Sequence, residues 1–187
     1  MSNYWDIIVD NMNENIWKRV EIVRRLLAID LIKKDVLEIG VGLGAAALSV
    51  TAALSGYWNY KGTDLSEKNC KFVENYSGLD VVRADIVDLP FKDKSFDVVI
   101  ALDVLEHVEH KERGYNEISR VLKDWGRVVL NIPLSISYHA KEQEFGFNTE
   151  DLYKLLITCK MEMEKYEVYS VTQGRTTRHY AWAVGVR

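Results

Sequence analysis

The sequence predicts an α/β fold, a three-layer sandwich with a mostly parallel seven-stranded sheet and one antiparallel strand in a C-terminal hairpin. Short apolar segments of strand length alternate with helical segments from residue 35 to residue 157, which is typical of parallel strands joined by helices. Beyond them, residues 161–169 show the period of two that indicates a strand, and residues 180–186 form a second extended run. The polar residues between these two segments indicate a hairpin, which supplies the antiparallel strand.

Residues 5–27 are predicted to form an amphipathic helix ahead of the sheet. Apolar residues recur there every three or four positions, at Trp5, Ile8, Met12, Ile16, Val20, Val23 and Leu27. We expect residues 1–30 to form a helical cap packed on the sheet, with a lid over the site as the alternative. Residues 35–187 are expected to complete a single domain, because a chain of 187 residues fits one folding unit.

Five strand segments precede the hairpin, at 35–39, 58–63, 81–83, 96–102 and 127–132. The apolar run of the fourth predicts burial on both faces. The predicted helices are 45–54, a helix capped by Ser66 that runs to Asn75, 111–122, and a helix capped by Asn148 or Thr149 that runs to Ile157. Residues 123–126 are predicted as a turn into the fifth strand, and residues 175–178 as a polar hairpin loop.

Composition disfavours several classes of protein. The formal net charge is -4, which lacks the positive field that binding to a nucleic-acid backbone requires. Cys70 and Cys159 lie far apart and form no metal-binding motif, so neither a disulfide framework nor a metal site is expected. No apolar run reaches the length of a membrane span, and the N-terminus lacks the pattern of a signal peptide. We therefore expect a cytoplasmic protein.

The strongest local signal is a glycine-rich turn between the first strand and the first helix of the sheet. Gly40, Gly42 and Gly44 form it, and residues without a Cβ let a ligand approach the N–H groups at the helix start. Gly40 and Gly42 with Ala45 also satisfy a dinucleotide-binding fingerprint. The turn alone therefore leaves the cofactor open.

Asp64 ends the second predicted strand, about 20 residues after the glycines, where a carboxylate can accept hydrogen bonds from both hydroxyls of a ribose. Such a residue suits the adenosine of a dinucleotide and equally the adenosine of another cofactor. The alternative interpretation is a solvated aspartate at the end of a strand. Its spacing from the glycines favours the binding role.

An ordered set of six motifs narrows the choice of cofactor. They are residues 36–44 with the glycine turn, 62–66 around Asp64, 84–91 with Asp85, 96–100, 103–108 with His107, and 120–123. In this order the motifs resemble the class I S-adenosylmethionine-dependent methyltransferases, in particular the small-molecule (type 11) group that includes the quinone-biosynthesis methyltransferases. The resemblance covers about residues 35 to 135 and implies a Rossmann-like fold. It also implies S-adenosylmethionine as cofactor and S-adenosylhomocysteine as product.

The resemblance assigns a role to each cofactor-binding position. Glu38 would help to hold the methionine end of the cofactor, Gly40, Gly42 and Gly44 would form the turn beneath it, and Asp64 would bind the ribose hydroxyls. Leu65, which follows Asp64, is also expected to belong to the cofactor site. Asp85 would accept from the adenine amino group, the Ile86 N–H would meet the adenine ring, and the Leu102 carbonyl would lie near the methionine amino group. One departure from the family is Trp125, because relatives commonly carry a proline and paired glycines in that turn.

Methyl transfer from a sulfonium is an in-line displacement, which positioning and exclusion of water can accelerate without a dedicated catalytic residue. If the acceptor is a hydroxyl, His107 and His139 are the candidate general bases. For His107 the alternative is a histidine that hydrogen-bonds locally and caps the next helix. For His139 the alternative is a solvated loop histidine.

The sequence therefore predicts methyl transfer from S-adenosylmethionine to an unidentified small-molecule acceptor. One alternative is a module that binds S-adenosylmethionine or S-adenosylhomocysteine without catalysis. The other is a nicotinamide-dependent oxidoreductase, which is disfavoured because its pyrophosphate would meet the like charge of Glu38. Neither the acceptor nor the oligomeric state can be read from the sequence.

Overall fold

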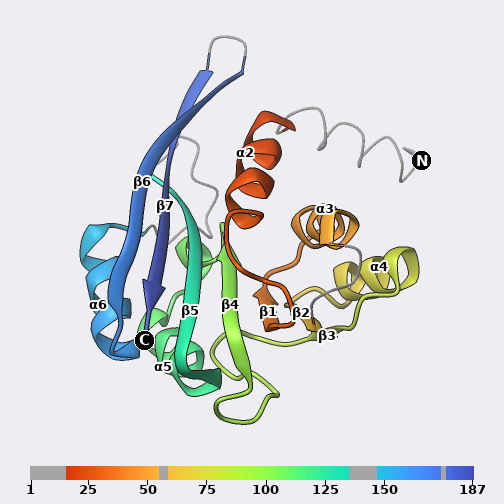
Figure 1. Cartoon of the computed structure of the whole chain (residues 1–187), viewed down its shortest axis with the longest axis horizontal. Helices are drawn as coiled ribbons and strands as arrows, with labels where there is room; N and C mark the ends of the chain where they lie inside the picture. Colours follow the sequence, from red (N-terminus) through yellow and green to blue (C-terminus); the bar gives the residue numbers. More distant parts are fainter. Residues whose placement is uncertain (1–15, 55–58, 135–146, 174–175) are drawn as a thin grey trace.

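The computed structural model describes residues 16–54, 59–134, 147–173 and 176–187. Its elements, labelled as in Figure 1, are α2 (Ile16–Leu26), β1 (Asp35–Ile39), α3 (Ala45–Leu54), β2 (Asn59–Asp64), α4 (Glu67–Ser77), β3 (Val81–Arg83), β4 (Phe96–Leu102), the 3-10 helix η1 (Leu105–His107), α5 (Lys111–Val121), β5 (Leu122–Pro133), α6 (Thr149–Cys159), β6 (Glu162–Gln173) and β7 (Thr176–Val186). The part of the predicted N-terminal helix before Ile16 lies outside the described residues.

The seven strands form one sheet in the order β3-β2-β1-β4-β5-β7-β6. Neighbouring strands from β3 to β5 pair in parallel. Strand β7 is antiparallel to both of its neighbours, β5 and β6, and is therefore the one antiparallel strand of the sheet. This topology confirms the predicted fold class.

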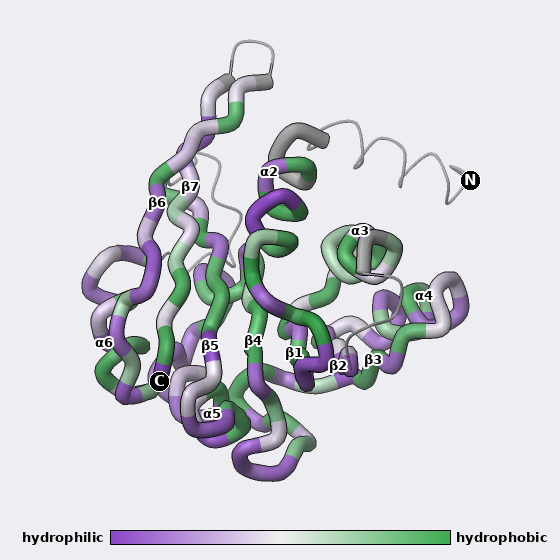
Figure 2. Tube along the Cα trace, viewed as in Figure 1, coloured by the Kyte–Doolittle hydropathy of each residue, from purple (hydrophilic) through white to green (hydrophobic). Residues whose placement is uncertain are grey.

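Helices cover the sheet on both faces and complete the three layers (Figure 1). One apolar core joins the sheet to α2, α3 and α4 through residues such as Leu26, Val50 and Val73. The other joins it to α5 and α6 through residues such as Ile118 and Leu155. Alternate residues of the central strands enter opposite cores, so these strands are mostly apolar (Figure 2). Helix α3 is mostly apolar as well, whereas the far end of the hairpin is not.

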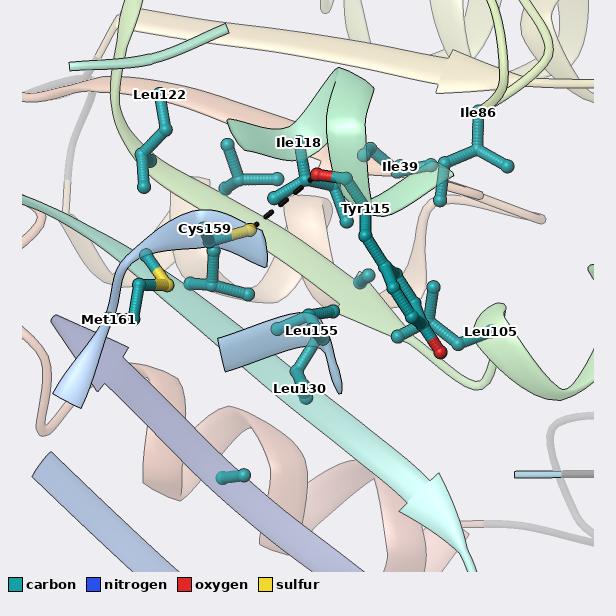
Figure 3. Packing of buried hydrophobic residues seen from close by; sticks show 14 of the residues in the cluster. Ile39, Ile86, Leu105, Tyr115, Ile118, Leu122, Leu130, Leu155, Cys159 and Met161 are labelled. Atoms are coloured by element: carbon teal, nitrogen blue, oxygen red, sulfur yellow. Dashed lines mark hydrogen bonds between the residues drawn. The ribbon is translucent and has the colours of Figure 1, made fainter. Parts of the chain in front are cut away.

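In the core between the sheet and the helices α5 and α6, Tyr115 lies among other buried apolar residues (Figure 3). The Cys159 thiol lies 3.5 Å from the Tyr115 carbonyl and donates to it. Burial raises the pKa of Cys159 to about 12, so the thiol stays protonated near neutral pH. The Tyr115 side chain is fully buried, and its hydroxyl makes no hydrogen bond within the described part of the chain.

Two predicted helix caps are present. The Ser66 hydroxyl accepts from the N–H of Asn69 and begins α4. Asn148 rather than Thr149 caps α6: its side chain accepts from the N–H of Asp151 at 3.0 Å, and the Asp151 carboxylate accepts from the N–H of Asn148 at 3.0 Å. This reciprocal capping box satisfies two donors at the start of the helix.

The prediction of a turn at residues 123–126 was wrong, because these residues belong to β5. Phe96 pairs with Leu122 and Val98 with Arg127, so β5 contains extra residues between these two partners. The chain absorbs them in a bulge where Trp125 adopts a φ of 66° and leaves its side chain 86% exposed. This bulge lies at the amino end of β5, which is the end of the sheet away from the glycine turn.

The hairpin is longer than its sequence pattern indicates. Pairing between β6 and β7 runs from Glu162 opposite Val186 to Gln173 opposite Thr176. Residues 176–178, predicted as part of a loop, are therefore strand. The hydroxyls of Thr172 and Thr177 lie 3.0 Å apart across the two strands, and this part of the hairpin projects beyond the rest of the sheet (Figure 1).

No helix within the described ranges is both long enough and apolar enough to cross a membrane. Over the same ranges, no group of three or more His, Cys, Asp or Glu side chains is arranged to hold a metal ion.

Candidate functional site

A cavity of about 540 Å³ lies at the carboxyl ends of the parallel strands. The strand order reverses between β1 and β4, and ligands of open α/β sheets bind at such a switch point. The lining residues follow four strands: β1 contributes Ile39, Gly40 and Gly42, β2 contributes Asp64 and Leu65, β3 is followed by residues 84–87, and β4 is followed by Asp103, Val104 and residues 107–110.

The three predicted glycines occupy different surroundings, although all have positive φ. A Cβ on Gly40 would lie 2.4 Å from a Val104 methyl group, so only glycine allows this close approach. Gly44 packs against Val73 on α4 and does not line the cavity. A Cβ on Gly42 would meet nothing within 4 Å, which leaves room for a ligand above the turn.

Asp64 lies beneath the glycine turn with both carboxylate oxygens engaged. Its Oδ2 accepts from the N–H of Gly42 at 2.8 Å. Its Oδ1 accepts from the N–H of Ser66 at 2.8 Å and from the Asn69 side chain at 3.3 Å. An ionised carboxylate has about four acceptor positions, so Asp64 retains capacity for a ligand hydroxyl while these donors fix its orientation.

Asp85 and Ile86 line the cavity on the side of β3. The Asp85 carboxylate accepts from the N–H of Val87 at 3.1 Å, which holds the turn after β3. Ile86 is buried, whereas Leu65, which also lines the cavity, is 64% exposed although it is apolar. An apolar side chain such as Ile86 can pack against a flat aromatic ring.

Like Gly44, the predicted cofactor residues Glu38 and Leu102 are not among the lining residues. Glu38 is buried on β1, where it accepts a 2.8 Å hydrogen bond from the Tyr60 hydroxyl. Burial raises the pKa of Glu38 to about 7, with a further contribution from the negative charge of Asp64. Leu102 is half-buried at the end of β4, beside Asp103.

Of the two candidate bases, His107 lines the cavity. It is the last residue of η1, its side chain is half exposed, and its Nε2 lies 3.8 Å from a Glu106 carboxylate oxygen. The alternative prediction that it caps the next helix was wrong, because His110 is the residue at the start of α5. His139 lies outside the described residues.

The cavity is acidic. Four carboxylates line it, those of Asp64, Asp85, Asp103 and Glu109, and no Lys or Arg belongs to the described residues that line it. Such a lining favours a cationic ligand. Sequence reasoning missed Asp103, although the signal was available, because it directly follows β4 as Asp64 ends β2.

The family of this chain follows from comparison with known proteins. A family model described as a methyltransferase domain matches residues 37–130, half of the chain, including the glycine turn, Asp64, Asp85 and His107. The chain belongs to this methyltransferase family. The match confirms the resemblance to class I S-adenosylmethionine-dependent methyltransferases, whose cofactor is S-adenosylmethionine.

Two relatives from Mycobacterium tuberculosis show how far the similarity extends. Phthiotriol/phenolphthiotriol dimycocerosates methyltransferase is 39% identical over 106 residues, which cover 55% of this methyltransferase and 39% of the relative. A protein named "Probable S-adenosylmethionine-dependent methyltransferase" is 29% identical over 158 residues, which cover 77% of this chain and 55% of the relative. The chain thus spans between about two fifths and about half of the length of these relatives.

The fold is shared with a solved methyltransferase structure from Methanosarcina mazei. The two structures superpose with a TM-score of 0.69 at 18% sequence identity, over 83% of this chain and 92% of the other. This similarity confirms the Rossmann-like architecture.

Proposed function

We propose that this methyltransferase transfers the methyl group of S-adenosylmethionine to a small-molecule acceptor by in-line displacement. The observation that carries the proposal is an acidic cavity that opens directly above the glycine turn. The sulfonium and ammonium groups of the cofactor are cations, which carboxylates stabilise. A nicotinamide dinucleotide would instead bring a negatively charged pyrophosphate into a site lined by carboxylates.

We infer the following contacts from the positions of the lining residues. Asp64 would accept from the ribose hydroxyls, with Leu65 beside the sugar, and Asp85 and Ile86 would hold the adenine. Gly40 and Gly42 would lie beneath the cofactor, and Gly44 would act indirectly by packing the turn on α4. The Leu102 carbonyl would face the methionine amino group. Glu38 would act from beneath the site, since it is buried against Tyr60.

When bound, S-adenosylmethionine supplies an activated methyl group and a neutral thioether leaving group. What the chain contributes is alignment of the acceptor and exclusion of water. For a hydroxyl acceptor, His107 is the base we propose, because its half-exposed imidazole lines the cavity and histidine is the side chain that most often serves as a general base. His139 remains a candidate for the same role.

We further infer a cytoplasmic enzyme with a small-molecule acceptor rather than a nucleic acid. Both cysteines are buried and free, as in reducing compartments, and the net charge of -4 disfavours binding to phosphate backbones. The name of the first mycobacterial relative specifies phthiotriol derivatives as its acceptors, which supports a small molecule. Residues 1–30 and 35–187 are proposed to form the cap and core of one domain.

The proposal is tested by titrating the purified protein with S-adenosylmethionine, S-adenosylhomocysteine and NADH while following thermal unfolding. A ligand at 100 times its dissociation constant stabilises the folded state by about 2.7 kcal/mol. We expect the midpoint to rise with both adenosyl ligands and not with NADH. A rise with NADH alone would contradict the proposal.

Methyl transfer itself is tested by screening small-molecule acceptors with cofactor carrying a radiolabelled methyl group. Transfer of the label to an acceptor is the expected result. Adenosyl binding without transfer to any acceptor would favour the non-catalytic module.

A further inference from the structure

Asp103, at the edge of the cavity, is held at two points by Asn131 on the neighbouring strand. The N–H of Asp103 donates to the Asn131 carbonyl at 2.9 Å. The Asn131 side-chain amide donates to Asp103 Oδ1 at 2.8 Å. Asp103 has a φ of 55°, a conformation that side chains other than glycine adopt rarely and that recurs at ligand sites. The two bonds from β5 therefore hold Asp103, which lines the cavity, in a left-handed backbone conformation.

Tyr169 on β6 fixes the orientation of the Asn131 amide. The Tyr169 hydroxyl donates to Asn131 Oδ1 at 2.7 Å, and both residues are buried. Burial raises the pKa of Tyr169, and the negative charge of Asp103 contributes, so the hydroxyl keeps the proton that it donates. Because the amide oxygen accepts from Tyr169, the amide nitrogen faces Asp103.

The Tyr169 ring is in turn fixed by Arg25 and Tyr180. The Arg25 guanidinium lies 4.0 Å from the centroid of the Tyr169 ring, within the range of a cation–π interaction. Arg25 is 4% exposed and pairs with Glu167 at 3.1 Å as well as with Glu21 on its own helix. The Tyr180 ring stacks on Tyr169 at 5.4 Å. Thus a continuous set of buried contacts runs from α2 to Asp103.

We propose that the Asp103 carboxylate accepts a hydrogen bond from the ammonium group at the methionine end of the cofactor, and that Asn131 and Tyr169 are positioning residues for this contact. The inference rests on the proposed function. Its basis is the order of the strand ends. With adenine at Asp85 after β3 and ribose at Asp64 at the end of β2, the rest of the cofactor would pass the glycine turn that follows β1 and reach the end of β4. Asp103 lies there and is followed by Val104, whose side chain occupies the space that a Cβ on Gly40 would need.

The test compares ligands that do and do not carry the methionine amino acid. Dissociation constants are measured by calorimetry for S-adenosylmethionine, S-adenosylhomocysteine and methylthioadenosine, which lacks that amino acid. Asp103→Asn should weaken the first two about tenfold, as loss of a charged hydrogen-bond partner does. Tyr169→Phe should weaken them about threefold. Neither change should alter the affinity for methylthioadenosine.

Tyr115→Phe is the matched control, because it removes a buried hydroxyl that makes no hydrogen bond within the described residues. It should leave all three affinities unchanged. The inference is overturned if Tyr169→Phe or Asp103→Asn leaves S-adenosylhomocysteine binding unchanged, or if either weakens methylthioadenosine equally, which indicates a general structural role. If the unmodified protein binds none of the adenosyl ligands, the proposed function itself fails and the inference with it.

Discussion

At the scale of single residues, the site needs glycine at two positions, Gly40 and Gly42, for two different reasons. Gly40 has a neighbour where its Cβ would lie, whereas Gly42 has open space. Both have positive φ, where a Cβ is unfavourable. Substitution of the first should therefore act mainly on stability, and substitution of the second mainly on binding.

We expect Gly40→Ala to lower the free energy of unfolding by about 3 kcal/mol, from backbone strain together with overpacking against Val104. Gly42→Ala should lower it by only about 1 kcal/mol but weaken S-adenosylhomocysteine at least about tenfold, since the methyl group would enter the cavity. Urea denaturation and calorimetry measure the two effects. Equal losses of stability in the two variants would contradict the assignment.

The buried Glu38 gives stability a pH dependence. Its pKa is raised from 4.5 to about 7 in the folded protein, so the native state binds more protons than the unfolded state between these values. The contribution of Glu38 to the free energy of unfolding is therefore complete below pH 4.5 and is lost as the pH rises through about 7. At 1.36 kcal/mol per unit the decline approaches about 3 kcal/mol.

Glu38→Gln should remove that decline, because the amide has no proton to lose and its oxygen can still accept from Tyr60. Urea denaturation of both proteins without ligand should give similar stabilities near pH 4.5 and a more stable variant at pH 8. If the free energies of unfolding of the two proteins changed in parallel across this pH range, ionisation of Glu38 would not lower stability, which would contradict the prediction.

Asp64→Ala should abolish detectable binding of S-adenosylhomocysteine while the protein stays folded. The substitution removes the proposed partner of the ribose hydroxyls and the acceptor for the N–H groups of Gly42 and Ser66. Calorimetry checks the binding, and circular dichroism checks the fold. An unchanged affinity would show that the ligand site has been misplaced.

At the scale of elements, helix caps and hydrogen bonds between elements stabilise the segments around the site. The Arg120 side chain on α5 donates to the carbonyls of Leu89 and Phe91, and the N–H of Leu89 donates to Glu117. These bonds attach the segment that follows Asp85 and Ile86 to α5. The capping box at Asn148 similarly fixes the start of α6, which closes the core on this face.

Asn148→Ala should lower the free energy of unfolding by about 1 kcal/mol, the usual effect of losing an N-cap, and leave cofactor binding unchanged. Thr149→Ala is the control, since Thr149 is exposed and is not the cap; its effect should stay within about 0.5 kcal/mol. Denaturation of the three proteins in urea tests this. A larger loss from the control would reverse the cap assignment.

At the scale of the whole molecule, all seven strands belong to one sheet, and the two apolar cores share it. Such an arrangement predicts one cooperative unfolding transition, with coincident curves from far-UV and near-UV circular dichroism. Two separated transitions would contradict the single domain. Added S-adenosylhomocysteine should shift the whole transition rather than a part of it.

The sequence by itself determined the features that depend on local pattern: the order of strands and helices, the limits of β1, α3 and β4, the glycine turn, and the acidic residues at strand ends. Only the tertiary structure decided the contacts between residues far apart in the chain and the effects of those contacts. The bulge at Trp125 follows from pairing with β4, the raised pKa of Glu38 from burial against Tyr60, and the orientation of Asp103 from Asn131 and Tyr169. Strand register and burial set these contacts, and neither is encoded in the spacing of neighbouring residues.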